Sequence, residues 1–315
     1  FRSPDSCTDT MPAIGLTGVT RQFGDVTALR DLDLTVQEGE IFGFLGPNGA
    51  GKSTTINVLL DFIRPTSGKA TVLGHDSHEE SHAIRQRIGV LPDGFQVYDR
   101  LTGLQHVEFA IDSKDANDDP MAVLERVGIP EAADRKAGEY SKGMAQRLAL
   151  GMALVGDPDL IILDEPSTGL DPNGAREMRE IIVEENQRGA TVFFSSHILE
   201  QVEAVCDRVG ILNEGRLVAE DSIRGLRQSM DTETVLTVSV SEATPAALRA
   251  VRRCDGVSEV SGQDGTISVT VGEGSKTNVL RALEEADVEV LDFATEESSL
   301  EDLFAAYTES EEVPA

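Results

Sequence analysis

Residues 46–53 read Gly-Pro-Asn-Gly-Ala-Gly-Lys-Ser, and this stretch decides the fold class. A short apolar segment typical of a strand, EIFGFLG at residues 40–46, leads into it, and a helical pattern runs from Ser53 to Ile63. A strand, a glycine-rich loop and a helix in that order match the pattern G-x-x-x-x-G-K-[ST] of phosphate-binding loops. The sequence therefore predicts an α/β domain of the P-loop nucleotide-hydrolase class.

The residue types of this loop suit a phosphate ligand. Glycines allow backbone N–H groups to turn toward phosphate oxygens, and the N-terminus of the following helix adds a positive partial charge. Lys52 is expected to reach the β- and γ-phosphates of ATP, and Ser53 to offer its hydroxyl to Mg²⁺. The predicted nucleotide-binding residues of the loop are Gly46, Pro47, Asn48, Gly49, Ala50, Gly51, Lys52, Ser53 and Thr54.

Two continuous apolar segments, Leu160–Leu163 and Thr191–Ser195, are typical of strands covered on both faces of a parallel sheet. Asp164 and Glu165 follow the first segment, where α/β sheets place their ligands. Asp164 is interpreted as a holder of Mg²⁺ and Glu165 as the base that orients an attacking water. The second segment leads to His197, which beside Asp164 could hydrogen-bond a γ-phosphate, although a lone histidine at a strand end is more often structural.

The pattern of the remaining chain predicts further parts. Residues 93–157 carry several helical signals and few strand signals, so we expect a helical insertion there. After a polar junction at 218–232, the tail reads β-α-β-β-α-β, the order of a small ferredoxin-like α+β domain, with a last helix at 298–307. The expected division is an extension at 1–13, an ATPase domain at 14–228 and an accessory domain at 229–315.

The composition limits the class of partner. The 315 residues include 56 acidic and 27 basic side chains, a formal net charge of −29, so nucleic acid is a poor partner for this surface and we expect none. The basic residues comprise 21 Arg and only 6 Lys. An acid-rich, Lys-poor surface suits concentrated salt, and we expect a salt-adapted (halophilic) protein from a high-salt organism. Three cysteines without a CxxC pair indicate a reducing compartment.

The ends of the sequence and its apolar runs are also informative. No apolar run approaches the roughly 18 residues that a membrane span needs, so action across a membrane requires a partner chain. Residues 1–10 lack the apolar centre of a secretory signal, and Met11 is interpreted as the natural start. Residues 1–13 are therefore expected to be disordered or non-native. His75, His78 and His82 are interpreted as a solvated, acid-rich helix start rather than a metal site.

Further motifs carry a resemblance to a known family. The segment Tyr-Ser-Lys-Gly-Met-Ala-Gln-Arg at 140–147 precedes Leu-Asp-Glu-Pro-Ser-Thr-Gly-Leu-Asp-Pro at 163–172. Together with the phosphate loop and His197, they resemble in order and spacing the ATP-binding subunits of ABC transporters, over residues 14–228. The Ser-Lys-Gly-Met form of the signature, the segment Asp-Arg-Leu-Thr-Gly at 99–103 and the tail are similar to the drug- and antibiotic-exporting branch.

The resemblance implies a mechanism and a set of site residues. Two copies would form a head-to-tail dimer that encloses ATP between the phosphate loop of one and the signature of the other, and the hydrolysis that Glu165 supports would reopen it. Phe23 would stack on adenine, and Asp93, where the family usually has Gln, would ligate Mg²⁺. The residues implied to act on the partner's ATP or in the D-loop are Ser141, Lys142, Gly143, Met144 and Asp171.

The resemblance also implies partners and leaves alternatives open. The expected function is an ATP-hydrolysing subunit that drives export through a separate membrane-spanning permease, at the cytoplasmic face of the membrane. One alternative is an ATPase that acts on ribosomes or nucleic acid, which the acidic surface disfavours. An importer ATPase and a regulatory binder that does not hydrolyse ATP are the others, and the coupling direction would be set by the permease.

Overall fold

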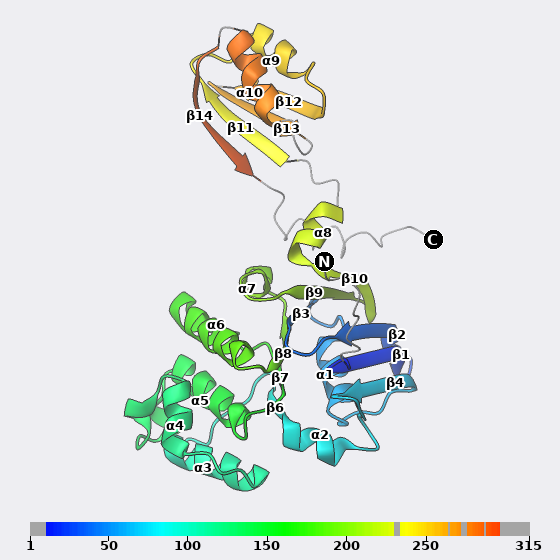
Figure 1. The fold of residues 1–315 in the computed structure, drawn as a ribbon, viewed down its shortest axis with the longest axis vertical. Coiled ribbons are helices and arrows are strands. Elements are labelled where there is room, and N and C mark those ends of the chain that lie inside the picture. The colour runs from blue at the N-terminus through cyan, green and yellow to red at the C-terminus, as the bar shows by residue number, and fades with distance from the viewer. Residues whose placement is uncertain (1–10, 230–233, 264, 272–275, 287, 297–315) are drawn as a thin grey trace, which may run out of the picture. The chain divides into compact units, whose positions relative to one another are not determined.

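The computed structural model describes residues 11–229, 234–263, 265–271, 276–286 and 288–296 (Figure 1). The chain divides into two compact units, Phe1–Ile223 and Arg224–Ala315. The polar junction predicted at 218–232 is wrong over most of its length, because β10 (Arg216–Ser222) and α8 (Ile223–Ser229) occupy it. An outer strand exposed along much of its length can be polar, and that composition imitates a loop.

The six-stranded sheet of the first unit has the order β10-β9-β3-β8-β7-β6. Strands β9, β3, β8, β7 and β6 run parallel, which confirms the predicted parallel core, while β10 runs antiparallel to β9, so the sheet as a whole is mixed. The parallel strands consist almost wholly of buried residues, which explains their continuous apolar sequences. They are β3 (Ile41–Leu45), β6 (Ile88–Leu91), β7 (Leu160–Asp164), β8 (Thr191–Ser196) and β9 (Arg208–Asn213).

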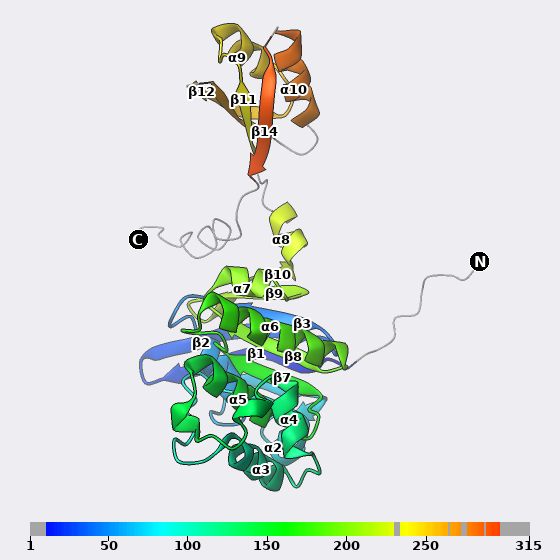
Figure 2. The same cartoon turned by 90° about the vertical axis from the view of Figure 1, so that its left-hand side faces the viewer.

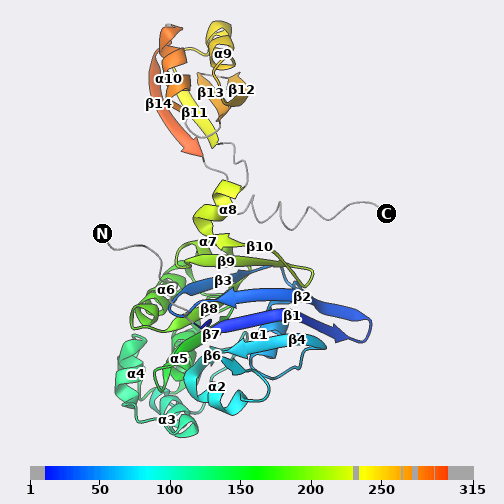
Figure 3. The same ribbon diagram turned by 45° about the vertical axis from the view of Figure 1, so that its right-hand side comes forward.

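A four-stranded antiparallel sheet of order β2-β1-β4-β5 lies next to it (Figure 3). Side chains of both sheets share one core, in which Phe193 stacks on Phe42 with ring centres 6.0 Å apart. Ala13 is fully buried in this core, so the expectation that residues 1–13 lie outside the folded part is wrong for Ala13. The strands are β1 (Ile14–Phe23), β2 (Val26–Val36), β4 (Ser67–Val72) and β5 (His75–Asp76).

The predicted helical insertion forms between β6 and β7. Its helices pack against one another (Figure 2), and the last of them packs against β6. Side-chain caps fix where they begin: Thr102 makes a reciprocal capping box with Gln105, and Asp119 and Ser141 cap the next two helices. The helices are α3 (Gly103–Lys114), α4 (Pro120–Arg126), η1 (Pro130–Ala132), η2 (Ala137–Glu139) and α5 (Lys142–Leu154). The other helices of this unit are α1 (Lys52–Leu59), α2 (Ser81–Arg87), α6 (Pro172–Gln187) and α7 (Leu199–Glu203).

The second unit has the predicted β-α-β-β-α-β order. Its antiparallel sheet has the strand order β12-β13-β11-β14, as in ferredoxin-like domains, and it shares an apolar core with two helices. The helix predicted at 298–307 lies outside the described residues. The elements are β11 (Thr234–Val240), α9 (Pro245–Val251), β12 (Val257–Gln263), β13 (Thr266–Val271), α10 (Lys276–Glu285) and β14 (Val290–Glu296).

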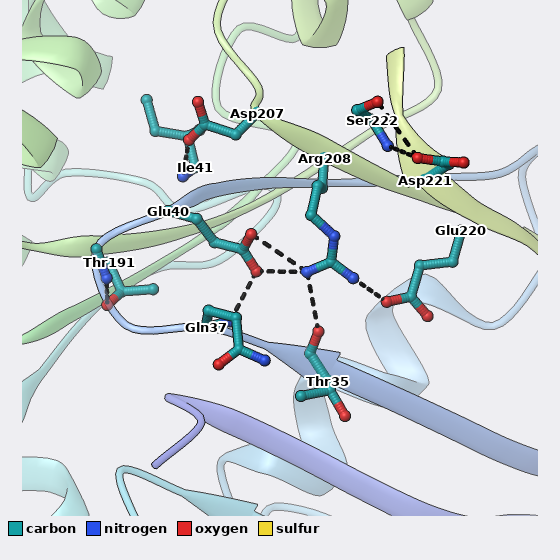
Figure 4. A network of polar contacts seen from close by, with 11 residues as sticks. Thr35, Gln37, Glu40, Ile41, Thr191, Asp207, Arg208, Glu220, Asp221 and Ser222 are labelled. Carbon is teal, nitrogen blue, oxygen red and sulfur yellow. Dashed lines mark hydrogen bonds and ion pairs between the residues drawn. The ribbon is translucent and has the colours of Figure 1, made fainter. Parts of the chain in front are cut away.

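A network centred on Arg208 ties together the end of the six-stranded sheet (Figure 4). The guanidinium of Arg208 donates to Glu40 Oε1 at 2.9 Å and to Glu220, and it reaches the Thr35 carbonyl at 3.4 Å. Burial raises the pKa of Glu220, and the charge of Glu40 adds to the effect, while Arg208 opposes it. One arginine therefore holds two acidic side chains that would otherwise repel each other.

Replacing Arg208 with Met is expected to lower the free energy of unfolding by about 2 kcal/mol, because two partly buried carboxylates lose their cation. Without Arg208, the pKa of Glu220 rises further, so the folded chain holds this proton to a higher pH than the unfolded chain. Stability of the variant then increases as pH falls, and its deficit should shrink between about pH 7 and pH 5. Urea unfolding measures this deficit, with the exposed Arg216→Met as the control. A deficit that is constant or larger at acid pH would contradict the assignment.

Candidate active site at the carboxyl ends of the strands

The phosphate loop runs from the end of β3 to the start of α1, as the sequence predicts. Glycine is required at two of its positions. A Cβ at Gly46 would lie 2.5 Å from the Leu212 carbonyl oxygen, and Gly51 caps α1 with a left-handed φ of 115°. The backbone can therefore approach a phosphate closely at the N-terminus of a helix.

Lys52 is buried at the start of α1, where its ammonium points back into the loop. Its Nζ donates to the Gly46 carbonyl at 2.7 Å and lies 3.6 Å from Glu165 Oε1. A buried lysine is retained only where carbonyl groups and an opposite charge surround it. This contact joins the loop to the end of β7, two parts of the sequence that were interpreted separately.

Asp164 lies at the end of β7, where Ser195 of the neighbouring strand β8 donates to its Oδ1 at 2.5 Å. Burial raises the pKa of Asp164, the charges of Asp93 and Glu165 raise it further, and hydrogen bonds from Ser195 and Ser53 lower it. A raised pKa means that the folded chain binds this proton above the ordinary value of 3.8. Ionised Asp164 therefore lowers stability as pH rises through that window, and a cation beside it would offset the loss.

Glu165 is the residue on which the site converges. Its backbone is left-handed, with φ 52°, a strained conformation that is common at functional sites. Oε2 lies 2.8 Å from His197 Nδ1 and accepts a hydrogen bond from Thr168 Oγ1 at 3.2 Å. Oε1 is buried and receives no hydrogen bond from the residues that the structure describes. This oxygen therefore has the capacity to accept a proton from a water molecule.

The sequence placed His197 beside Asp164, and the structure places it against the next residue, Glu165. Two further polar residues of the site were missed, Ser195 and Thr168. Ser195 was counted only as part of an apolar strand, although it is two residues before His197 and every second residue of a strand shares a face. Thr168 gave no signal, because its contact depends on how the loop after β7 turns back.

A magnesium site was predicted at Ser53, Asp164 and Asp93. Ser53 and Asp93 both lie close enough to Asp164 to shift its pKa, Ser53 downward and Asp93 upward. A hydroxyl and carboxylates are the hard oxygen donors that Mg²⁺ prefers, so the residues fit the ion. Within the described ranges, no group of three or more His, Cys, Asp or Glu side chains is arranged for a metal.

The histidines near β5 make other contacts. His75 Nδ1 lies 2.9 Å from Glu80 Oε1, and His78 Nδ1 lies 2.9 Å from Asp61 Oδ1. Each histidine thus contacts a different acidic side chain.

The signature and the D-loop lie together within the chain. Ser141 caps α5 by accepting from the Met144 N–H at 3.2 Å, and Asp171 caps α6 by accepting from the Gly174 N–H at 2.8 Å. The side chain of Lys142 lies over Gly169, where a Cβ would come within 2.0 Å of its Nζ. Ser141 and Lys142 are exposed, and a Cβ at Gly143 would meet open space. The N-terminus of α5 is therefore free to meet an anion.

The fold and the site define a P-loop ATPase with a signature helix in an inserted helical subdomain. A family model described as "ABC transporter" matches residues 29–168, and one described as "ATP-binding protein DrrA1-3-like, C-terminal domain" matches residues 222–308. The bacitracin transport ATP-binding protein of Bacillus licheniformis is 36% identical, over 92% of this chain and 95% of its own length. The linearmycin resistance ATP-binding protein of Bacillus subtilis is 31% identical, over 92% and 96%.

Other relatives match about two thirds of the chain. An uncharacterised ABC transporter ATP-binding protein of Nostoc is 43% identical over 66% of this chain, which spans 63% of that relative's length. A solved dimeric bacterial ABC transporter cassette covers 67% of this chain and 99% of its own, with 27% identity and a TM-score of 0.62. The chain belongs to the family of ABC transporter ATP-binding proteins, and its activity is that of an ABC-type ATPase. Among the described residues, no helix is both long and apolar enough to cross a membrane.

Proposed function

We propose that the chain is the subunit that hydrolyses ATP to drive an exporter, working on a separate membrane-spanning permease. The position of Glu165 is the observation that supports ATP hydrolysis by this chain. Its carboxylate lies between Lys52 and His197, at the carboxyl ends of two adjacent parallel strands and beside the phosphate loop. Open α/β sheets bind their ligands at the carboxyl ends of their strands.

The proposed reaction assigns each of these groups a role. Lys52 binds the β- and γ-phosphates, and Glu165 accepts the proton of the attacking water while His197 holds its other carboxylate oxygen. The water oxygen bonds to the γ-phosphorus as the bond to the bridging oxygen breaks, and ADP leaves with that electron pair. Ser53, Asp164 and Asp93 would hold Mg²⁺, which supplies charge neutralisation at the phosphates.

The second half of the site is proposed to come from another copy of the chain. Ser141, Gly143 and Asp171 lie on a part of the molecule that is largely accessible, and a solved relative is a dimer. Two copies carry a formal charge of −58 (2 × −29), so closure brings like charges together. We therefore propose that salt assists dimerisation and that the acidic surface is an adaptation to concentrated salt.

A groove between the core and the helical insertion is proposed to receive the permease. It has a volume of about 530 Å³, and its lining includes Leu60, Phe62, Phe95, Phe109, Lys114 and Met152. Phe62 and Phe109 are more than half exposed, which is unusual for clustered aromatic side chains unless a partner covers them. Arg85 and Lys114 are the charged residues of the lining. A permease segment that is apolar and bears one acidic residue would therefore suit the groove. Phe95 comes two residues after Asp93, which links the groove to the catalytic site.

Introducing a negative charge into the groove provides the test. Phe109→Glu, in the Glu165→Gln background with Mg-ATP, is expected to reduce the permease recovered with the subunit at least tenfold, because the groove loses its apolar wall. Met121→Glu, an exposed apolar residue of the same insertion outside the groove lining, is the control. ATP binding by the isolated variants checks that they fold. Equal recovery with both variants would overturn the docking assignment.

The names of relatives guide the proposed cargo. One relative is named for bacitracin transport and another for linearmycin resistance, and both match nearly the whole chain. We therefore infer that the cargo is an antibiotic or drug-like compound and that the direction is export.

A further inference from the structure

Adenine is proposed to stack on one face of the Phe23 ring, and the side chain of Arg21 lies over a face of the same ring. Phe23 ends β1 with 42% of its surface exposed. The guanidinium carbon of Arg21 lies 4.3 Å from the centre of the Phe23 ring. Residues two apart on a strand share a face, which explains why these side chains meet. A cation over a ring face at this distance is a favourable contact that also limits how the ring can turn.

Arg21 is itself fixed by the chain that follows the phosphate-loop helix. Its Nη1 donates to the Arg64 carbonyl at 2.8 Å, and the neighbouring Gln22 N–H donates to Thr66 Oγ1 at 3.1 Å. Arg21 Nε is buried and makes no hydrogen bond to the described residues, so the guanidinium is held by its other end and by the ring. The side chain is therefore part of a defined structure rather than a solvated surface cation.

The strand pairing connects this pair to the phosphate loop. Arg21 is the register partner of Leu29 on β2, and a Cβ at Gly51 would lie 2.9 Å from Leu29 Cδ2. The aromatic ring and the phosphate loop are thus separated by one strand pairing and one packing contact. A ring fixed by Arg21 would have a set position relative to the phosphates.

We infer that Arg21 is a positioning residue for nucleotide binding. It covers one face of Phe23 and presents the other face, already oriented, to the adenine of ATP. The inference rests on the proposed role of Phe23 as the base-stacking residue. Ordering a side chain in advance removes a penalty that the ligand would otherwise meet on binding, so the effect falls on affinity for a nucleotide with an aromatic base.

The test compares two probes, ATP and inorganic tripolyphosphate, which carries phosphates without a base. Arg21→Met is expected to raise the Kd and KM for ATP about threefold, with a smaller change in kcat, and to leave tripolyphosphate affinity unchanged. In a Phe23→Leu background, the same substitution should have no further effect on the Kd of ATP. Arg21→Lys keeps the charge without the planar group and should give an intermediate Kd. Arg30→Met removes an exposed arginine of β2 and is the control.

The outcomes separate the inference from the function on which it rests. If Phe23→Leu raises the Kd for ATP but Arg21→Met does not, the inference is wrong and the base-stacking role stands. If Phe23→Leu leaves the Kd unchanged, the proposed role of Phe23 itself fails. If Arg21→Met weakens tripolyphosphate as much as ATP, or acts equally in the Phe23→Leu background, Arg21 acts on the fold or the phosphates and the inference is overturned. Thermal unfolding of Arg21→Lys shows whether the fold survives.

Discussion

Turnover of ATP is expected to fall about a hundred- to ten-thousandfold when Glu165 is replaced by Gln, while ATP binding persists. The amide keeps the shape of the side chain but cannot accept the proton of the attacking water. Oε1 of Glu165 is the buried oxygen that has no hydrogen bond among the described residues, and its partner oxygen is already held by His197 and Thr168. Phosphate release under saturating Mg-ATP measures the turnover, and equilibrium dialysis with ATP measures the binding.

Glu214→Gln is the matched control for this substitution. Glu214 also has a left-handed backbone, with φ 46°, and it is exposed in the turn between β9 and β10. Removal of its charge should change turnover less than twofold. Normal turnover in Glu165→Gln would remove Glu165 from the role of the base.

The same variant is expected to accumulate as an ATP-bound dimer, because hydrolysis no longer reopens the closed pair. Closure should be more complete in molar KCl than in dilute buffer, since salt screens the repulsion between two chains of charge −29. Equal dimerisation in both buffers, measured by sedimentation, would contradict the proposed salt adaptation.

The second large effect is expected from Lys52→Ala. Its Nζ already lies against the Gly46 carbonyl and near Glu165, so the ammonium is directed into the phosphate loop. Loss of charge-assisted bonds to phosphate, worth about 3 kcal/mol together, should raise the Kd for ATP about a hundredfold. Equilibrium dialysis with Mg-ATP measures the change, and turnover should fall with it.

Lys69→Ala provides the control, because Lys69 is an exposed lysine of the same unit whose partner Asp76 lies outside the site. It should bind ATP as the unaltered chain does. If Lys52→Ala retained full affinity, the phosphates would have to bind elsewhere, and the loop assignment would be wrong.

The parts of the site that could be predicted from sequence are those that short local patterns encode. The phosphate loop needs glycines and a helix N-terminus at fixed spacing, so residues 46–53 can be identified from the sequence alone. Asp164, Glu165 and His197 lie at the ends of strands that are buried along their whole length and largely apolar. That pattern locates the catalytic edge of a parallel sheet. The ferredoxin-like tail was likewise predictable, because each of its elements has a clear period.

The parts that could not be predicted depend on contacts between distant segments. The bond from Ser195 to Asp164 requires β7 and β8 to be neighbours, and the pairing of His197 with Glu165 requires the backbone of Glu165 to turn left-handed. The sequence of β10 is polar and therefore predicts a junction, and the structure explains this composition because the strand is largely exposed. The groove that we propose for the permease could not be predicted, since its aromatic residues come from the turn after α1, the loop after β6 and α3.

ATP hydrolysis by this chain is proposed to drive a membrane partner, and a pull-down of the trapped complex can identify that partner. The Glu165→Gln variant is tagged, expressed in its native host, held closed with Mg-ATP and recovered from membranes solubilised in high salt. We expect to recover a polytopic membrane protein in stoichiometric amount, which is lost with Phe109→Glu and kept with Met121→Glu. Recovery of ribosomes, nucleic acid or only soluble proteins would contradict it.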